Sequence, residues 1–103
     1  MDDAANNIQN IVLDENPNVK SNDRLPIQAP IKVLRYKTIK KNSSLGWWSA
    51  IVLVEDHDKK MVCFYRWRKK GNEWKRDKKL PFHSRAEWHA VKDAVESFMD
   101  QVA

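Results

Sequence analysis

The chain has 103 residues, of which 42% are hydrophobic, and a formal net charge of +5. This length suits one hydrophobic core, so we expect no second domain, and the apolar content excludes a wholly disordered chain. Cys63 is the only cysteine, which excludes an internal disulfide and argues against a structural zinc site. The sequence therefore predicts a single globular domain that is held together by packing alone.

Nothing in the sequence indicates a membrane partner or an export signal. The longest apolar run covers residues 50–54, far fewer than the roughly 20 residues that a membrane span needs. The chain begins with Met1, Asp2 and Asp3 rather than with a basic segment. We expect a soluble intracellular protein, in the cytoplasm or nucleoid of a prokaryote or in the nucleus of a eukaryote.

The charge is unevenly distributed along the chain. Residues 31–79 carry fifteen basic and five acidic side chains, a net charge of +10, whereas residues 1–30 carry −3 and residues 80–103 carry −2. A field of one sign over one surface attracts polyanions such as nucleic acids. The alternative is that these lysines and arginines only solvate the surface of the domain.

The first 30 residues differ in character from the rest. They are rich in asparagine and aspartate, contain Pro17, Pro26 and Pro30, and show no helical or strand periodicity. We predict a flexible acidic N-terminal tail over residues 1–30 and a folded domain over residues 31–103.

Four β-like segments follow, at residues 31–39, 47–55, 60–68 and 73–82, and polar turns separate them. The third alternates most clearly, with Met61, Cys63, Tyr65 and Trp67 on one face and Val62, Phe64, Arg66 and Arg68 on the other. The sequence thus predicts an antiparallel sheet of four strands.

A helix closes the chain. Ser84 and Glu87 form a capping box, which predicts a helix over residues 85–101. Its apolar residues recur at spacings of three and four, in the series Trp88, Val91, Val95, Phe98 and Val102. We expect this stripe to cover the sheet, which gives an α+β fold of four antiparallel strands followed by one C-terminal helix.

Residues for catalysis or metal binding are lacking. The three histidines, His57, His83 and His89, are dispersed, and no glycine-rich phosphate loop, metalloprotease motif or nucleophile elbow is present. We expect residues 56–58 to form a solvated turn rather than a metal site, and we expect Cys63 to be a buried, inert thiol. We expect no enzymatic activity, no cofactor, no metal and no small-molecule substrate.

Aromatic and basic residues alternate at residues 65–70 and 74–79. Single-stranded nucleic acid needs this pairing, because its bases stack on aromatic rings and its phosphates pair with lysine and arginine. Duplex DNA, whose bases are already stacked, would make little use of the rings.

The five tryptophans must be divided between core and surface. Trp47 and Trp48 are consecutive in a strand, so they point to opposite faces and at most one belongs to the core. The other is explained equally by base stacking and by a subunit interface. We expect Trp88 in the core and at least one of Trp67 and Trp74 at the surface. A homodimer would bury the apolar surplus and pair the open sheet edges.

Three features suggest a family resemblance: the strand end Tyr65-Arg66-Trp67, the cationic fourth strand with Lys75, Lys78 and Lys79, and the helix entry with Ser84 and Trp88. Over residues 46–102 they resemble the single-stranded-DNA-binding domain of the Positive Cofactor Four transcriptional coactivator family, and Whirly and Pur-alpha proteins are similar in architecture. The resemblance implies that Trp67 stacks on a base and that the three lysines follow the phosphate backbone.

We therefore predict a homodimer that binds single-stranded DNA or RNA largely without sequence preference, acting in transcription, replication or repair. The alternatives are a protein-interaction module and a duplex DNA or chromatin binder. The residues expected to bind nucleic acid are Arg35, Lys37, Lys40, Lys41, Trp48, Arg66, Trp67, Arg68, Lys69, Lys70, Trp74, Lys75, Arg76, Lys78 and Lys79.

Overall fold

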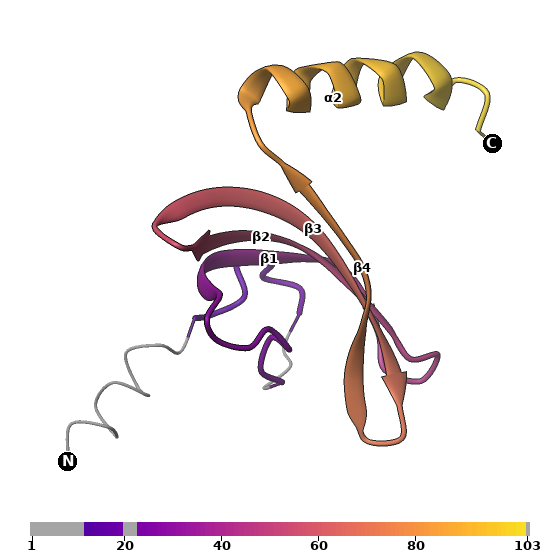
Figure 1. The fold of residues 1–103 in the computed structure, drawn as a ribbon. Helices are drawn as coiled ribbons and strands as arrows, with labels where there is room; N and C mark the ends of the chain where they lie inside the picture. Colours follow the sequence, from indigo (N-terminus) through magenta and orange to yellow (C-terminus); the bar gives the residue numbers. More distant parts are fainter. Residues whose placement is uncertain (1–11, 20–22, 103) are drawn as a thin grey trace.

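The computed structural model describes residues 12–19 and 23–102. Its elements, in chain order, are β1 (Lys32–Asn42), β2 (Trp47–Asp56), β3 (Lys59–Lys70), β4 (Glu73–Phe82) and α2 (Arg85–Met99). The strands form one antiparallel sheet in the order β1-β2-β3-β4 (Figure 1). The predicted fold of four antiparallel strands followed by a helix is confirmed.

Tight turns join the central strands. His57 and Asp58 connect β2 to β3 with φ values of 51° and 65°, and two consecutive left-handed residues match the twist of a two-residue hairpin. Gly71 adopts the left-handed region, with φ 63°, between β3 and β4. Within residues 12–19 and 23–102, no three metal-ligating side chains converge.

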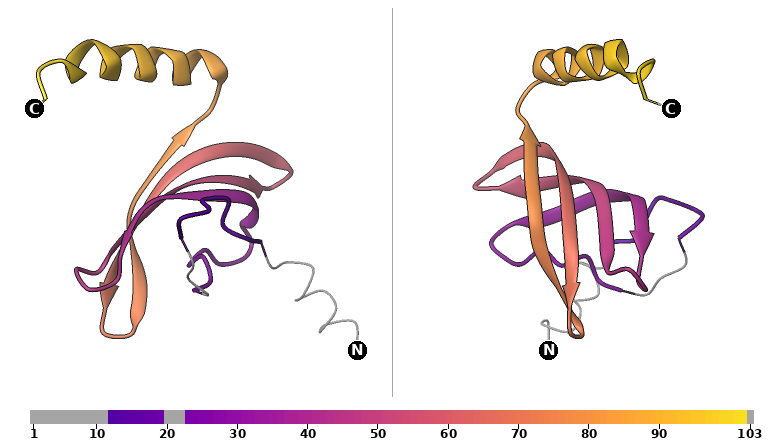
Figure 2. Two further views of the ribbon diagram at one scale, coloured as in Figure 1. Left: turned by 180° about the vertical axis from the view of Figure 1, so that it is seen from behind. Right: turned by 90° about the vertical axis from the view of Figure 1, so that its right-hand side faces the viewer.

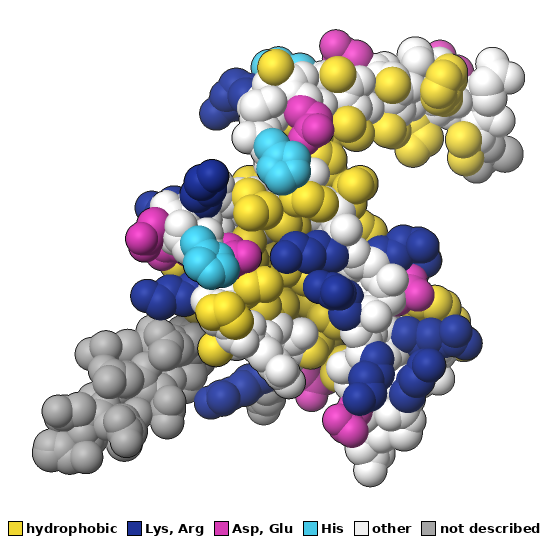
Figure 3. Space-filling view, in the orientation of Figure 1, with side chains coloured by type: hydrophobic (Ala, Val, Ile, Leu, Met, Phe, Trp, Pro, Cys, Tyr) yellow, Lys and Arg dark blue, Asp and Glu magenta, His cyan; other side chains and the backbone are white. Residues whose placement is uncertain are grey.

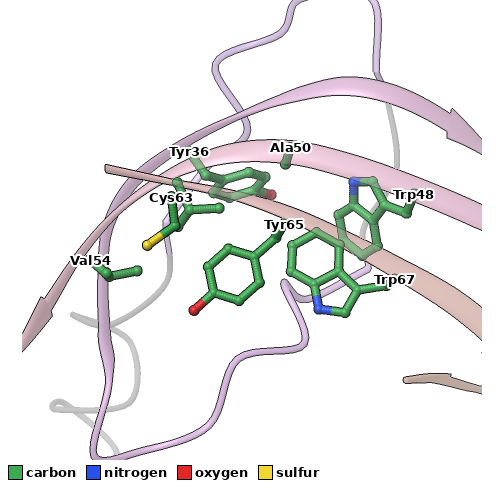
Figure 4. Packing of buried hydrophobic residues seen from close by; sticks show 8 residues of the cluster. Tyr36, Trp48, Ala50, Val54, Cys63, Tyr65 and Trp67 are labelled. Carbon is green, nitrogen blue, oxygen red and sulfur yellow. The ribbon is translucent and has the colours of Figure 1, made fainter. Parts of the chain in front are cut away.

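The core lies on one face of the curved sheet, which we call the inner face. Every second residue of β2 and β3 is buried there, together with Tyr36 of β1; the strand residues are Trp48, Ala50, Val52, Val54, Cys63, Tyr65 and Trp67 (Figure 4). The indole N–H of Trp48 donates to the hydroxyl of buried Thr38 at 2.9 Å. Burial raises the pKa of the Cys63 thiol, so the thiol stays protonated and poorly nucleophilic at neutral pH.

The N-terminal segment, residues 12–19 and 23–31, covers the inner face. Val12, Leu25 and Ile27 pack against the core, and the segment follows the hollow of the sheet (Figure 1). The carboxylate of Asp14 accepts a hydrogen bond from the backbone N–H of Thr38 at 2.9 Å. We expected residues 1–30 to form a flexible tail, whereas the described part of these residues packs against the core. Residues 1–11 and 20–22 lie outside the described residues.

The helix begins as the capping box predicts. The backbone N–H of Glu87 donates to the Ser84 hydroxyl at 3.0 Å, and the carboxylate of Glu87 accepts from the backbone N–H of His83 at 2.8 Å. No helix in the described part of the chain is long and apolar enough to cross a membrane.

The expectation that α2 covers the sheet is wrong. No residue of α2 is buried, and among the strands and helices described it packs only against β4. Trp88, which we expected in the core, touches the ring of Phe82 at a centroid distance of 5.4 Å but remains 43% exposed. The helical period identifies the apolar side of α2, but it does not determine which surface packs against that side. In this chain the N-terminal segment, and not α2, covers the core face of the sheet.

Candidate nucleic-acid interface

The face of the sheet opposite the core, which we call the outer face, divides into two halves. Its residues alternate with the buried ones, so those of β3 are Val62, Phe64, Arg66 and Arg68. The half near the β2–β3 turn is apolar, and the half near the β3–β4 turn is basic. We call this end of the sheet, with both of its faces, the basic end; it includes the last residues of β1 and β3 and the first residues of β2 and β4.

A tryptophan lies between two arginines on the outer face of the basic end. The guanidinium carbons of Arg66 and Arg68 lie 5.0 and 5.3 Å from the ring centroid of Trp47. This contact follows from register, because Trp47 is paired with Arg68 across β2 and β3. Arg66 is also held by Asp77, whose carboxylate accepts from its Nε at 2.8 Å. The half-buried Trp47 thus combines a partly open aromatic ring with two neighbouring positive charges.

A second aromatic and cationic group lies at the same end on the inner face. The ring centroids of Trp48 and Trp74 are 5.5 Å apart, and Lys41 Nζ lies 4.0 Å from the Trp48 centroid. Lys69 Nζ lies 5.7 Å from the centroid of Trp74. Trp74 is half-buried, so its ring is the partly open one of the two.

No protein-family model, curated protein or solved structure matches this chain. The chemistry of the basic end therefore carries the functional argument. Rings flanked by cations can stack on bases while the cations neutralise phosphates.

Seven of the fifteen predicted binding residues are exposed cations that the sheet brings to the basic end. Figure 3 shows Lys and Arg side chains gathered over the β3–β4 hairpin. These exposed lysines and arginines are Lys40, Arg68, Lys69, Lys70, Lys75, Arg76 and Lys78. Arg66 and Lys41 are half-buried there.

Three predicted residues lie away from this end. Arg35 and Lys37 sit in the middle of β1, opposite Leu53 and Ile51. Lys79 is half-buried, and its Nζ lies 5.7 Å from the ring centroid of buried Tyr65. We therefore do not include these three in the basic end.

Two predicted aromatic contacts do not fit the structure. Trp67 is 0% exposed and Trp48 is 1% exposed, and both belong to the core on the inner face. The reason is strand alternation, because Trp67 faces away from the neighbouring Arg66 and Arg68. Neither ring can stack on a base while the inner face is covered.

The sequence interpretation missed Trp47. The sequence contains a weak indication that Trp47 lies outside the core. Strand alternation places Trp48 on the same face as Ala50 and Val52, whereas it places Trp47 on the same face as the polar Ser49. Both series are largely apolar, so the phase alone did not decide which tryptophan belonged to the core.

Acidic side chains of the N-terminal segment occupy two of the predicted cations. Arg35 donates to both carboxylate oxygens of Glu15, at 2.6 and 2.7 Å, and this hydrogen bonding lowers the pKa of Glu15. The ammonium of Lys41 donates to Asp23 at 2.7 Å. Carboxylates thus bind these cations as a phosphate would.

Proposed function

We propose that the protein binds single-stranded nucleic acid, DNA or RNA, with little sequence preference. The observation that carries the proposal is the partly open ring of Trp47 between Arg66 and Arg68. Exposed cations surround it at the basic end. Such a protein would act inside the cell on strands exposed during transcription, replication or repair, as the resemblance to Positive Cofactor Four domains suggests.

Physical chemistry favours single strands over duplex at this surface. A base can stack on Trp47 or Trp74 only if it has left its own stack, and each base–aromatic contact is worth about 1–3 kcal/mol. The cations are spread over a sheet, whereas direct reading of duplex sequence uses a helix or ribbon inserted into the major groove. Because α2 carries a net negative charge, it is a poor candidate for that insertion.

Titration with matched single-stranded and double-stranded 20-mers at two salt concentrations tests the proposal. We expect tighter binding of the single strand, a steep loss of affinity with salt, and quenching of tryptophan fluorescence. Equal affinity for the duplex would favour a duplex or chromatin binder instead. Absent or salt-independent binding would reject a nucleic-acid function and favour a protein-interaction module.

Neutralising the two acidic partners should tighten oligonucleotide binding. In the double variant Glu15→Gln and Asp23→Asn, neutral amides replace two carboxylates that lie beside Arg35 and Lys41, so the surface near these cations is more positive and attracts phosphates more strongly. We expect a few-fold lower Kd, measured by fluorescence anisotropy at low salt. The matched control is Asp93→Asn with Glu96→Gln, which removes the same charge from α2. An equal gain in the control would mean that only net charge matters.

A further inference from the structure

The two partly open tryptophans of the basic end lie on opposite faces of the sheet. Trp47 of β2 is on the outer face, with the guanidinium groups of Arg66 and Arg68 beside its ring. Trp74 of β4 is on the inner face, where its ring contacts the buried Trp48. A strand of nucleic acid that stays on one face can therefore stack on only one of these two rings.

Cations continue from one face to the other across β4. Lys75 of β4 is paired with Arg68 of β3, so both side chains lie on the outer face. The next residue, Arg76, is paired with Trp67 and lies on the inner face. Lys75 and Arg76 are both exposed. Phosphates that follow these side chains would pass from the outer face to the inner face over the edge of the sheet.

The edge at β4 is open over the basic end. The strand order is β1-β2-β3-β4, so β4 has no second neighbour among the strands of the described residues. Figure 2 shows α2 at the opposite end of β4 from the β3–β4 turn. Lysine and arginine side chains on an edge strand disfavour pairing with a further strand. The same side chains attract a polyanion.

The charge of the β3–β4 hairpin favours such a path. Residues 66–79 carry eight basic and two acidic side chains. The two acidic residues, Glu73 and Asp77, lie 3.9 Å from the Nζ of Lys75 and 2.8 Å from a guanidinium nitrogen of Arg66. Since the basic residues outnumber them by six, the hairpin keeps a strong positive charge on both faces.

We propose that one single strand passes round the edge of β4, with one base stacked on Trp47 and a second base stacked on Trp74. The phosphates between these bases follow Arg68, Lys75 and Arg76. This inference rests on the proposed function and defines the path of the strand at the same site. A duplex is too stiff and too wide to follow this path, so the path itself selects single strands.

The distance between the two rings suits a short run of nucleotides. Trp47 lies two strands away from β4, which is roughly 10 Å across the outer face. The passage to the inner face adds about 10 Å if the spacing of packed sheets is taken as the thickness of one sheet with its side chains. The whole path is about 20 Å, or about six nucleotides at the spacing of a stacked strand, and fewer nucleotides if the strand is extended.

Oligonucleotides with only two bases test this path. Each contains two thymidines separated by one, three, five or seven abasic nucleotides, and its Kd is compared with that of a strand of equal length that has one thymidine. This ratio cancels the effect of the added phosphates. We expect no gain from the second base at one abasic nucleotide and a gain of about fivefold or more at five, because the spacer then reaches the second ring. Fluorescence anisotropy at low salt measures each Kd.

Variants of the two rings identify where the second base binds. Trp74→Ala and Trp47→Ala should each abolish the gain from the second base, whereas Trp74→Phe should retain much of it. The matched control is Trp88→Ala, which removes a 43% exposed tryptophan outside the path and should leave the gain unchanged. Circular dichroism of each variant checks that the fold is retained.

The outcomes separate the path from the proposed function. If the unaltered chain binds the strands but gains nothing from the second base at any spacing, the path is wrong and the proposed function stands. The same holds if the gain is largest at one abasic nucleotide, or if Trp74→Ala leaves it unchanged, because the strand then stays on one face. If no single strand binds at all, both proposals fail.

Discussion

Replacing Trp67 by alanine is expected to lower the free energy of unfolding by about 3–5 kcal/mol. The Trp67 ring is fully buried, stacks on Tyr65 at a centroid distance of 5.3 Å and contacts Trp48 at 5.0 Å. Alanine would leave a cavity among rings that are held by the sheet. Urea denaturation followed by circular dichroism, at one fixed protein concentration, measures the change.

Two control variants separate the packing role of Trp67 from a binding role. Trp67→Phe keeps an aromatic ring, and it removes an indole N–H for which the described residues provide no acceptor, so we expect a smaller loss of stability. Trp47→Ala should also destabilise less, because Trp47 is only half-buried. Unchanged stability in Trp67→Ala together with weakened oligonucleotide binding would place Trp67 at the surface and contradict the structure.

The local elements were predictable because their signals are local. Polar turns separate segments with strand character, and Ser84 with Glu87 fixes the start of α2 through two hydrogen bonds. The placement of Trp47 and Trp48 on opposite faces also follows from alternation alone. These inferences needed no knowledge of the tertiary fold.

The assignment of faces was not predictable in the same way, because both faces of β2 are largely apolar. Whether the helix or the N-terminal segment covers the core depends on long-range packing by residues such as Val12 and Leu25. The N-terminal segment has no periodicity because it lies across the sheet in irregular conformation. Its few apolar residues therefore gave no signal of their role.

The candidate site illustrates the difference between neighbours in sequence and neighbours in space. Trp67 stands between Arg66 and Arg68 in the chain, yet its ring lies on the other face of the sheet. Trp47 is distant in sequence, but the antiparallel register brings it against the same two arginines. Residue types alone predicted an aromatic ring among cations, and only the register identifies which ring it is.

Replacing Trp47 by alanine should weaken binding of a single-stranded 20-mer by about 1–3 kcal/mol, which is roughly 5- to 150-fold in Kd. The lost contact is a base stack, so the dependence of affinity on salt should stay the same. Trp47→Phe retains a ring and should recover much of the affinity. Anisotropy titrations at several salt concentrations measure both quantities.

Arg68→Gln should have the complementary effect, because Arg68 is an exposed cation beside Trp47. Loss of one phosphate contact lowers the slope of log K against log salt by about 0.7 for a single strand. The control Lys59→Gln removes one charge from the far end of β3 and should leave that slope unchanged. If Lys59→Gln and Arg68→Gln behave alike, the strand is attracted by the net charge of the whole domain. If only Arg68→Gln lowers the slope, and only Trp47→Ala weakens binding at constant slope, then stacking and phosphate pairing occur side by side at the basic end.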